Sequence, residues 1–137
     1  MRDFKNIKAF QYSDDLVVMI YEATKDFPRE ELYGLTSQLR RAAVSVATNI
    51  AEGASRQHKR DYLNFLYTAR GSLAETEYLL HLAERLGYLT HEKFEEIDNL
   101  RRVTAKTLFG LIESVDKETK LALRSFVFGL LSLVYFP

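Results

Sequence analysis

The stretch from Lys59 to Gly87 constrains the fold of this chain more than any other part of the sequence. Apolar or small residues recur along it at alternating intervals of four and three positions. This stripe consists of Tyr62, Leu66, Ala69, Leu73, Thr76, Leu80 and Ala83. Its spacing is that of a heptad seam on an α-helix, and further apolar residues beside it give the width typical of a helix in a bundle. We therefore predict a helix that begins near Lys59 and ends before Gly87.

Three further segments have helical periodicity. The first covers about residues 12–25, with Ser13 as its N-cap and Asp14 and Asp15 in its first turn. Another begins between residues 28 and 36 and ends near residue 53. The last opens at Thr90, a capping threonine, and its apolar series reaches Val115. No run alternates with the period of two that a sheet needs. We therefore predict an all-α, up-and-down antiparallel four-helix bundle with a C-terminal apolar extension.

Two glycines in these segments need a structural reason. Gly71 falls in the middle of a predicted helix, where glycine costs about 1 kcal/mol relative to alanine. We expect a close helix crossing at Gly71 and Ser72 to offset that cost. Gly53 is expected just after the end of its helix, because glycine tolerates the left-handed conformation that often ends helices.

The end of the chain, SFVFGLLSLVYFP, runs for 13 residues without a charge. It is too short to span a bilayer as a helix. It either continues the last helix, straps across the bundle, contacts another copy or anchors at a membrane surface. The lack of an opposing basic face favours protein contact over membrane contact. We accordingly divide the chain into a bundle domain over residues 1–118 and an apolar tail over residues 119–137.

Charge is balanced overall but uneven along the chain. Formal net charge is zero, with 19 basic and 19 acidic residues, unlike a generic basic nucleic-acid binder. Residues 38–70 include six basic and two acidic residues, a local excess of four positive charges. The six are Arg40, Arg41, Arg56, Lys59, Arg60 and Arg70. There is no cysteine, so disulfides and thiolate metal sites are excluded. The N-terminus lacks the apolar region of a secretory signal, and we expect a cytoplasmic protein.

Several short phrases occur together in an order that points to one family. They are FP at 27–28, YGLTSQLRRA at 33–42, NIAEG at 49–53, ARGSL at 69–73 and LGYL at 86–89. Over about residues 10–115 the chain resembles the small four-helix-bundle proteins encoded within intervening sequences of bacterial 23S ribosomal RNA genes. That family is similar to the accessory proteins of diversity-generating retroelements. The resemblance implies a homo-oligomer, expected to be a pentamer, with a nucleic-acid or ribonucleoprotein role.

This chain departs from the family pattern in two ways. The retroelement accessory proteins are strongly basic, whereas this chain is neutral, which favours the ribosomal-gene branch and weakens the expectation of tight nucleic-acid binding. The apolar tail after Lys120 lies outside the usual pattern and leaves its packing open.

Each group of basic residues has two interpretations. Arg40 and Arg41 either contact phosphate or pair with acids of a neighbouring helix or subunit. Arg56, Lys59 and Arg60 lie in a loop and the first turn of the following helix, where cations oppose the helix dipole. Either phosphate binding or a later start of that helix would account for this placement.

The acidic residues and histidines give no chemical site. Glu52 is expected to pair with Arg56 four positions later. Glu77, His81 and Glu84 share a helix face but lack the second Glu-x-x-His motif of a di-iron bundle, so we interpret them as a surface network. We predict no catalytic residue, cofactor or metal.

The function predicted from these observations is a non-enzymatic, homo-oligomeric scaffold associated with ribosomal RNA or a ribonucleoprotein. It would bind the phosphate backbone weakly through the six basic residues. The alternative is a protein–protein adaptor without nucleic-acid contact. A metal-dependent bundle enzyme is a more distant interpretation.

Overall fold

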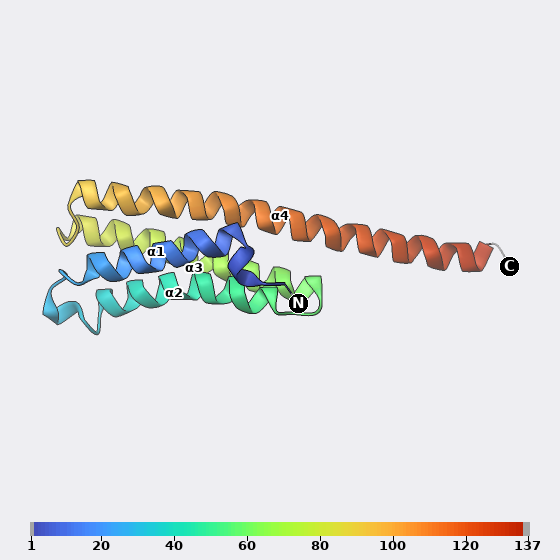
Figure 1. Ribbon diagram of the computed structural model, residues 1–137, viewed down its shortest axis with the longest axis horizontal. Helices are drawn as coiled ribbons and strands as arrows, with labels where there is room; N and C mark the ends of the chain where they lie inside the picture. Colours follow the sequence, from blue (N-terminus) through green and yellow to red (C-terminus); the bar gives the residue numbers. More distant parts are fainter. Residues whose placement is uncertain (1, 136–137) are drawn as a thin grey trace.

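The computed structural model describes residues 2–135 of the 137-residue chain and contains four α-helices and two short 3-10 turns within that range (Figure 1). The elements are η1 (Phe4–Asn6), α1 (Lys8–Thr24), η2 (Arg29–Glu31), α2 (Leu35–Ala54), α3 (Lys59–Arg85) and α4 (His91–Tyr135). Each α-helix packs on the next one in the chain, and α1 also packs on α4. No strand occurs among the described residues. The predicted all-α four-helix bundle is therefore confirmed.

The core consists of the helix faces that the periodicity predicts. All seven residues of the α3 stripe are buried. They pack with buried residues of the other helices, including Leu16, Ile20, Leu39, Val46, Ile50, Ile97 and Leu108. Burying a large apolar side chain of this kind contributes about 1.5–3 kcal/mol, so these stripes are the main source of stability.

The connection between α3 and α4 follows the sequence signals closely. Gly87 has a positive φ of 76°, and its N–H donates to the Glu84 carbonyl at 2.9 Å. The Tyr88 N–H donates to the Ala83 carbonyl at 2.9 Å, which completes the end of α3. The Thr90 hydroxyl accepts the Lys93 N–H at 3.1 Å and caps α4. Both predicted boundaries are confirmed.

The predicted start of the first helix is wrong. α1 begins at Lys8, and Ser13 lies buried inside it, with its hydroxyl donating to the Phe10 carbonyl at 2.7 Å. The helix starts earlier because the preceding turn packs on the bundle. In that turn Asp3 caps η1, and the rings of Phe4 and Phe10 meet edge to face at 4.7 Å.

Both glycine predictions need correction. Gly53 lies within α2 and is buried. A Cβ at this position would come within 2.8 Å of the Phe65 Cβ, so only glycine fits there without a shift of the helices. Its role is therefore close packing of α2 on α3, not chain reversal. Gly71 is exposed, and a Cβ added there would have no neighbour within 4 Å, so no helix crosses at this position. Only Ser72 faces α2, where its hydroxyl lies 2.8 Å from that of Ser45.

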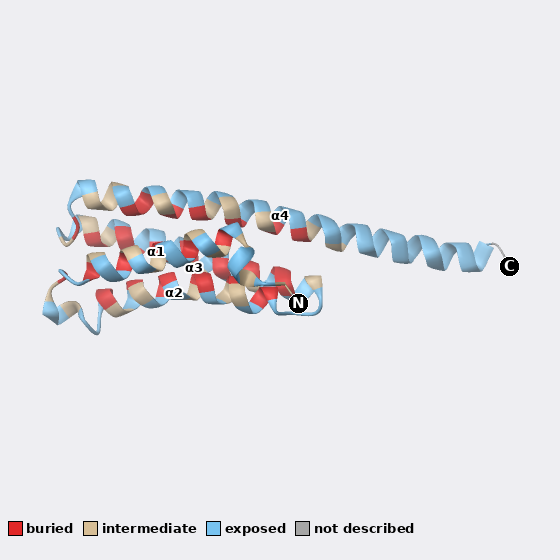
Figure 2. Ribbon diagram, viewed as in Figure 1, coloured by how far each residue is buried: buried red, intermediate tan, exposed pale blue. Residues whose placement is uncertain are grey.

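α4 is much longer than its partners and leaves the bundle. Burial on α4 ends at Val115, and every described residue after Thr119 is exposed (Figure 2). Of the four arrangements open for the apolar end, the structure has the continued helix, and a strap across the bundle is wrong. None of the helices within residues 2–135 combines the length and apolarity needed to cross a bilayer.

Candidate nucleic-acid interface

The α2–α3 corner, residues 55–60, joins two helices that lie unusually close together. Gly53 permits that approach, and the buried ring of Tyr62 packs against it from α3. The corner itself stays outside the core. Arg56 and Arg60 are exposed, and Lys59 is partly exposed. These cations therefore lie in the loop and the first turn of α3, as the sequence predicts, and outside the core.

Lys59 has a partner within the protein. Its Nζ lies 3.0 Å from Oε2 of Glu118 on α4, in a pair that is about half exposed on both sides. An exposed pair of this kind contributes about 0.5 kcal/mol. α3 does begin at Lys59, so a later helix start does not explain the cation there. The Glu118 carboxylate does, because it places a negative charge beside the positive end of the α3 dipole.

Arg56 is held by aromatic and backbone contacts. Its guanidinium lies 4.5 Å from the centre of the Phe65 ring, and its carbonyl accepts a hydrogen bond from Arg2 at 3.2 Å. The expected ion pair between Glu52 and Arg56 does not form among the described residues. The Arg56 guanidinium packs on the Phe65 ring instead, because stacking and cation–π attraction favour a planar guanidinium there.

Arg70 repeats this arrangement further along α3. Its guanidinium lies 5.0 Å from the centre of the Tyr67 ring, and both side chains are exposed. Arg60 and Tyr67 are seven residues apart, two helical turns, so they lie on the same outer face of α3. An arginine resting on an aromatic ring keeps its remaining donors available for phosphate oxygens.

Arg40 has a structural role that neither prediction described. Its Nε donates to the Thr24 hydroxyl at 2.8 Å, and its guanidinium lies 4.6 Å from the Tyr21 ring centre. The side chain therefore supports the C-terminal end of α1, where a positive charge complements the dipole. Arg41 is exposed and lines a shallow hollow beside Tyr21 and Asn49.

The six basic residues do not form one cluster. Arg41 and Arg56 are fifteen residues apart on and just after one helix, which corresponds to about 22 Å along the bundle. The structure brings Arg56, Lys59 and Arg60 together at the corner. It places Arg70 on the flank of α3 and the Arg40–Arg41 pair toward the other end of α2.

Two of the three residues considered for a metal site, Glu77 and Glu84, contact side chains of α4. Glu77 pairs with Arg101 of α4 at 3.3 Å, and Glu84 contacts His91 at 2.6 Å. The hydrogen bond that Nδ1 of His91 donates to the Glu84 carboxylate raises the pKa of His91 above its ordinary value. Within residues 2–135, no three histidine or carboxylate side chains are placed to hold a metal ion.

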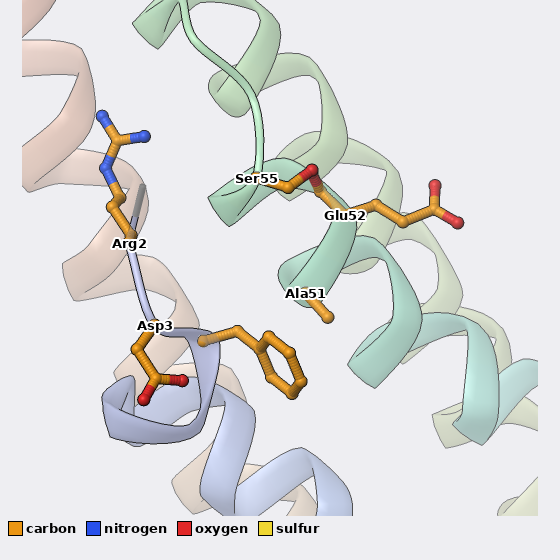
Figure 3. Close-up of a pocket in the computed structure, with 6 residues that line it drawn as sticks. Arg2, Asp3, Ala51, Glu52 and Ser55 are labelled. Carbon is orange, nitrogen blue, oxygen red and sulfur yellow. The ribbon is translucent and has the colours of Figure 1, made fainter.

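A hollow of about 530 Å³ lies next to the corner, between the N-terminal segment and α2 (Figure 3). Arg2 and Asp3 line one side, and Ala51 and Ser55 line the other, while the Glu52 side chain turns away from Arg2. Asp3 is already used as a cap, since one of its oxygens accepts the Lys5 N–H at 3.1 Å. The hollow thus lacks the two converging groups that acid–base catalysis requires.

Sequence reasoning missed four residues that shape the basic surface: Arg2, Phe65, Tyr67 and Glu118. Glu118 lies three positions after Val115, so the periodicity of α4 places it on the side of the helix that faces the bundle. This spacing could have predicted that Glu118 lies near the other helices. Phe65 and Tyr67 lie on the clearest helix, although spacing alone does not pair them with arginines. Nothing in the sequence pattern places Arg2 over the Tyr62 ring, where its guanidinium lies 4.7 Å from the centre.

Comparison with known proteins agrees with this architecture. Residues 5–110 match the family described as 23S rRNA-intervening sequence protein. A solved structure from Bacteroides thetaiotaomicron, a protein of unknown function from the S23 ribosomal protein family, is similar to this chain with 30% sequence identity and a TM-score of 0.71. The similarity covers 77% of this chain and 95% of that chain. No curated protein sequence matches the chain. The chain belongs to the 23S rRNA-intervening sequence protein family.

Proposed function

We propose that this protein is a non-enzymatic, self-associating cytoplasmic scaffold that contacts the phosphate backbone of ribosomal RNA, or of a ribonucleoprotein, through the α2–α3 corner. The observation that carries the proposal is the exposed pair of arginines at the corner, one of them resting on an aromatic ring. Arg56 lies 4.5 Å from the Phe65 ring centre, and Arg60 is exposed four residues later, in the first turn of α3.

The form of the corner favours backbone contact over base reading. Guanidinium groups offer several donors to phosphate oxygens, and such contacts carry no sequence information. Arg70 on the Tyr67 ring extends the same chemistry along α3. The exposed Tyr67 ring beside Arg70 also suits an unpaired base of single-stranded RNA, which stacks on such a platform.

Self-association is needed because one copy is neutral overall. A single corner offers only two or three phosphate contacts, which gives weak and salt-sensitive binding. Repetition of the corner in an oligomer raises the overall affinity without any new contact. The pentamer expected from the family resemblance is one arrangement that would provide this repetition.

The test compares two double variants with the same change in charge. Arg56→Ala with Arg60→Ala removes two cations at the corner but spares Lys59 and its pair with Glu118. The measurement is binding to a ribosomal RNA fragment over a range of salt concentrations. We expect weaker binding and a salt slope reduced by about 1.4 for each copy that contacts the RNA, since each contact to a single strand contributes about 0.7.

The matched control replaces two exposed arginines at the opposite end of the bundle, Arg29→Ala with Arg85→Ala. The control is expected to bind RNA as the parent does, because only the corner is proposed to contact phosphate. If both double variants lose the same affinity, the effect is one of net charge alone and the corner is not the interface. If neither loses affinity, Arg56 and Arg60 are not the contact, and a parent protein that binds no RNA would overturn the RNA proposal itself.

One observation favours the second candidate function, a protein–protein adaptor without nucleic-acid contact. The described end of α4 exposes large apolar side chains, including Phe126, Phe128 and Leu133. A partner protein that stays bound after nuclease treatment and in high salt, together with no affinity for RNA, would support the adaptor over the scaffold.

A further inference from the structure

The end of α4 exposes an unusually large amount of apolar surface for a single copy. The α4 extension, residues 121–135, runs for about 22 Å beyond the bundle (Figure 1). Its large apolar side chains are between 48% and 79% exposed. They are Leu121, Leu123, Phe126, Val127, Phe128, Leu130, Leu131, Leu133, Val134 and Tyr135.

The area of this surface is that of a protein interface. Ten such side chains at about 100 Å² each expose about 1,000 Å² of apolar surface, estimated from typical side-chain areas. Monomeric proteins rarely expose apolar patches above about 600 Å². At about 100° per residue these side chains point all around the helix, so one face presents about half of that area, about 500 Å², toward the roughly 800 Å² that each partner buries in a stable interface.

The same chain carries an apolar groove of matching length. The α1–α2 groove consists of three hollows along the outer flank of α2. The hollow beside the N-terminal segment shares Ala51 and Glu52 with the central hollow, and the central hollow shares Val44 and Thr48 with the third. It runs from Arg41 to beyond Ala51, as far as residue 55, which is about 21 Å.

The groove and the extension match in shape and in chemistry. Phe10 and Val17 of α1 face Val44, Ala47 and Ala51 of α2 across the central hollow, so its lining is mainly apolar. The small side chains of α2 leave room for a helix to approach closely. The extension presents its own small residues in the register of the α4 seam, at Ala122, Ser125, Gly129 and Ser132.

The charges of the two surfaces are also complementary. Asp14 and Glu52 line the centre of the groove, with Arg41 and Arg2 at its two ends, and neither carboxylate takes part in an ion pair within residues 2–135. Lys117 and Arg124 lie at the base of the extension and are likewise outside the ion pairs of that range. Beyond Arg124 the extension has no charge, so it lacks the basic face with which an interfacial helix binds a membrane.

We infer that the α4 extension of one copy of this chain lies in the α1–α2 groove of another copy. The groove of the same copy is out of reach, because α4 is one continuous helix whose extension points away from the bundle (Figure 1). The contact joins two different surfaces, so successive copies form a closed ring or an open chain. The inference rests on the self-association in the proposed function and identifies the surfaces that carry it.

The chain contains no cysteine, which makes disulfide trapping a direct test. Thr48→Cys places a thiol on the exposed floor of the groove, and Ser132→Cys or Ser125→Cys places one on the extension with almost no change in volume. A copy with the groove cysteine is mixed with a copy with an extension cysteine and oxidised. We expect about tenfold more cross-linking in this mixture than with Glu75→Cys, an exposed α3 position, in place of Thr48→Cys.

Sedimentation of the full-length protein separates the possible results. Phe128→Glu, at an exposed position on the same helix face as Ser125 and Ser132, is expected to reduce the assembled fraction while leaving the helical content unchanged. Cross-linking mainly between two extension cysteines would show that extensions pair with one another and would overturn the inference, although self-association would stand. A wild-type chain that sediments as a monomer at all concentrations would overturn both. Binding to phosphatidylglycerol vesicles without assembly would also overturn both.

Discussion

Replacing Gly53 with alanine tests the packing of α2 on α3 at its tightest point. The added Cβ would lie 2.8 Å from the Phe65 Cβ and 2.9 Å from Cδ2 of Tyr62. Neither neighbour can move alone, because the first is attached directly to the α3 backbone and the Tyr62 ring is only 1% exposed. We therefore expect Gly53→Ala to push the two helices apart.

The size of the effect follows from two opposing contributions. Overpacking in a well-packed core costs about 1–3 kcal/mol, and contacts this short on two fixed neighbours place the cost near the upper end. Alanine recovers about 1 kcal/mol through its better helix propensity. The net loss in free energy of unfolding is therefore about 2 kcal/mol.

Gly71→Ala is a control with the same chemical change and the opposite expectation. Nothing lies within 4 Å of a Cβ at that position, so only the helix propensity acts, and we expect a gain of about 1 kcal/mol. Urea unfolding followed by circular dichroism measures both variants. The protein concentration is held fixed, because self-association makes the midpoint concentration-dependent. A Gly53→Ala variant as stable as Gly71→Ala would refute the packing argument.

Three further expectations concern α4. Burial alone would raise the pKa of Asp98, but hydrogen bonds from Arg101 and its neighbour outweigh burial and hold this pKa below the ordinary value. Ionised Asp98 therefore stabilises the fold above about pH 4, the unfolded value, and this is lost as the pH falls through the folded pKa. We expect Asp98→Asn to cost about 3 kcal/mol at neutral pH, because the buried Arg101 then keeps only the exposed Glu77 as a carboxylate partner; an unchanged urea midpoint would contradict this. The raised pKa of His91 adds stability that is complete below its unfolded pKa and lost as the pH rises through the folded one; NMR titration should show the pKa returning toward its ordinary value in Glu84→Gln. Thr90→Ala should lower the free energy of unfolding by about 1 kcal/mol in the same urea assay, and no change would show that the cap contributes nothing.

The helix faces were predictable because burial acts on a periodic pattern. Every residue of the Tyr62–Ala83 stripe is buried, since only one face of a helix in a bundle is covered. The Gly87 and Thr90 boundaries were predictable because their signals act within one turn of the chain. The predicted N-cap at Ser13 was wrong because serine is also acceptable inside a helix, where its hydroxyl can bond to a backbone carbonyl. Packing of the N-terminal turn on the bundle outweighed the capping preference of Ser13.

The contacts that the basic residues make were much less predictable. An exposed arginine has several partners of similar energy, and the choice depends on side chains brought close only by the fold. Arg40 supports the end of α1, and Lys59 meets Glu118 from a helix that is distant in sequence. Gly53 shows the same limit, because the residue that requires a glycine there, Phe65, lies on the neighbouring helix.

Assembly and RNA contact depend on one another in the proposed scaffold. Arg40 and Lys59 are already used within the bundle, so one copy offers mainly Arg56 and Arg60 at the corner. Two contacts give little affinity at ordinary salt concentrations. The extension leaves the bundle just after Glu118, which is beside the same corner. Copies joined through their extensions would therefore present one corner at every junction, and the affinity would follow the number of copies. A chain with no net charge is compatible with an RNA-associated role on this basis, because repetition replaces the charge that a single copy lacks.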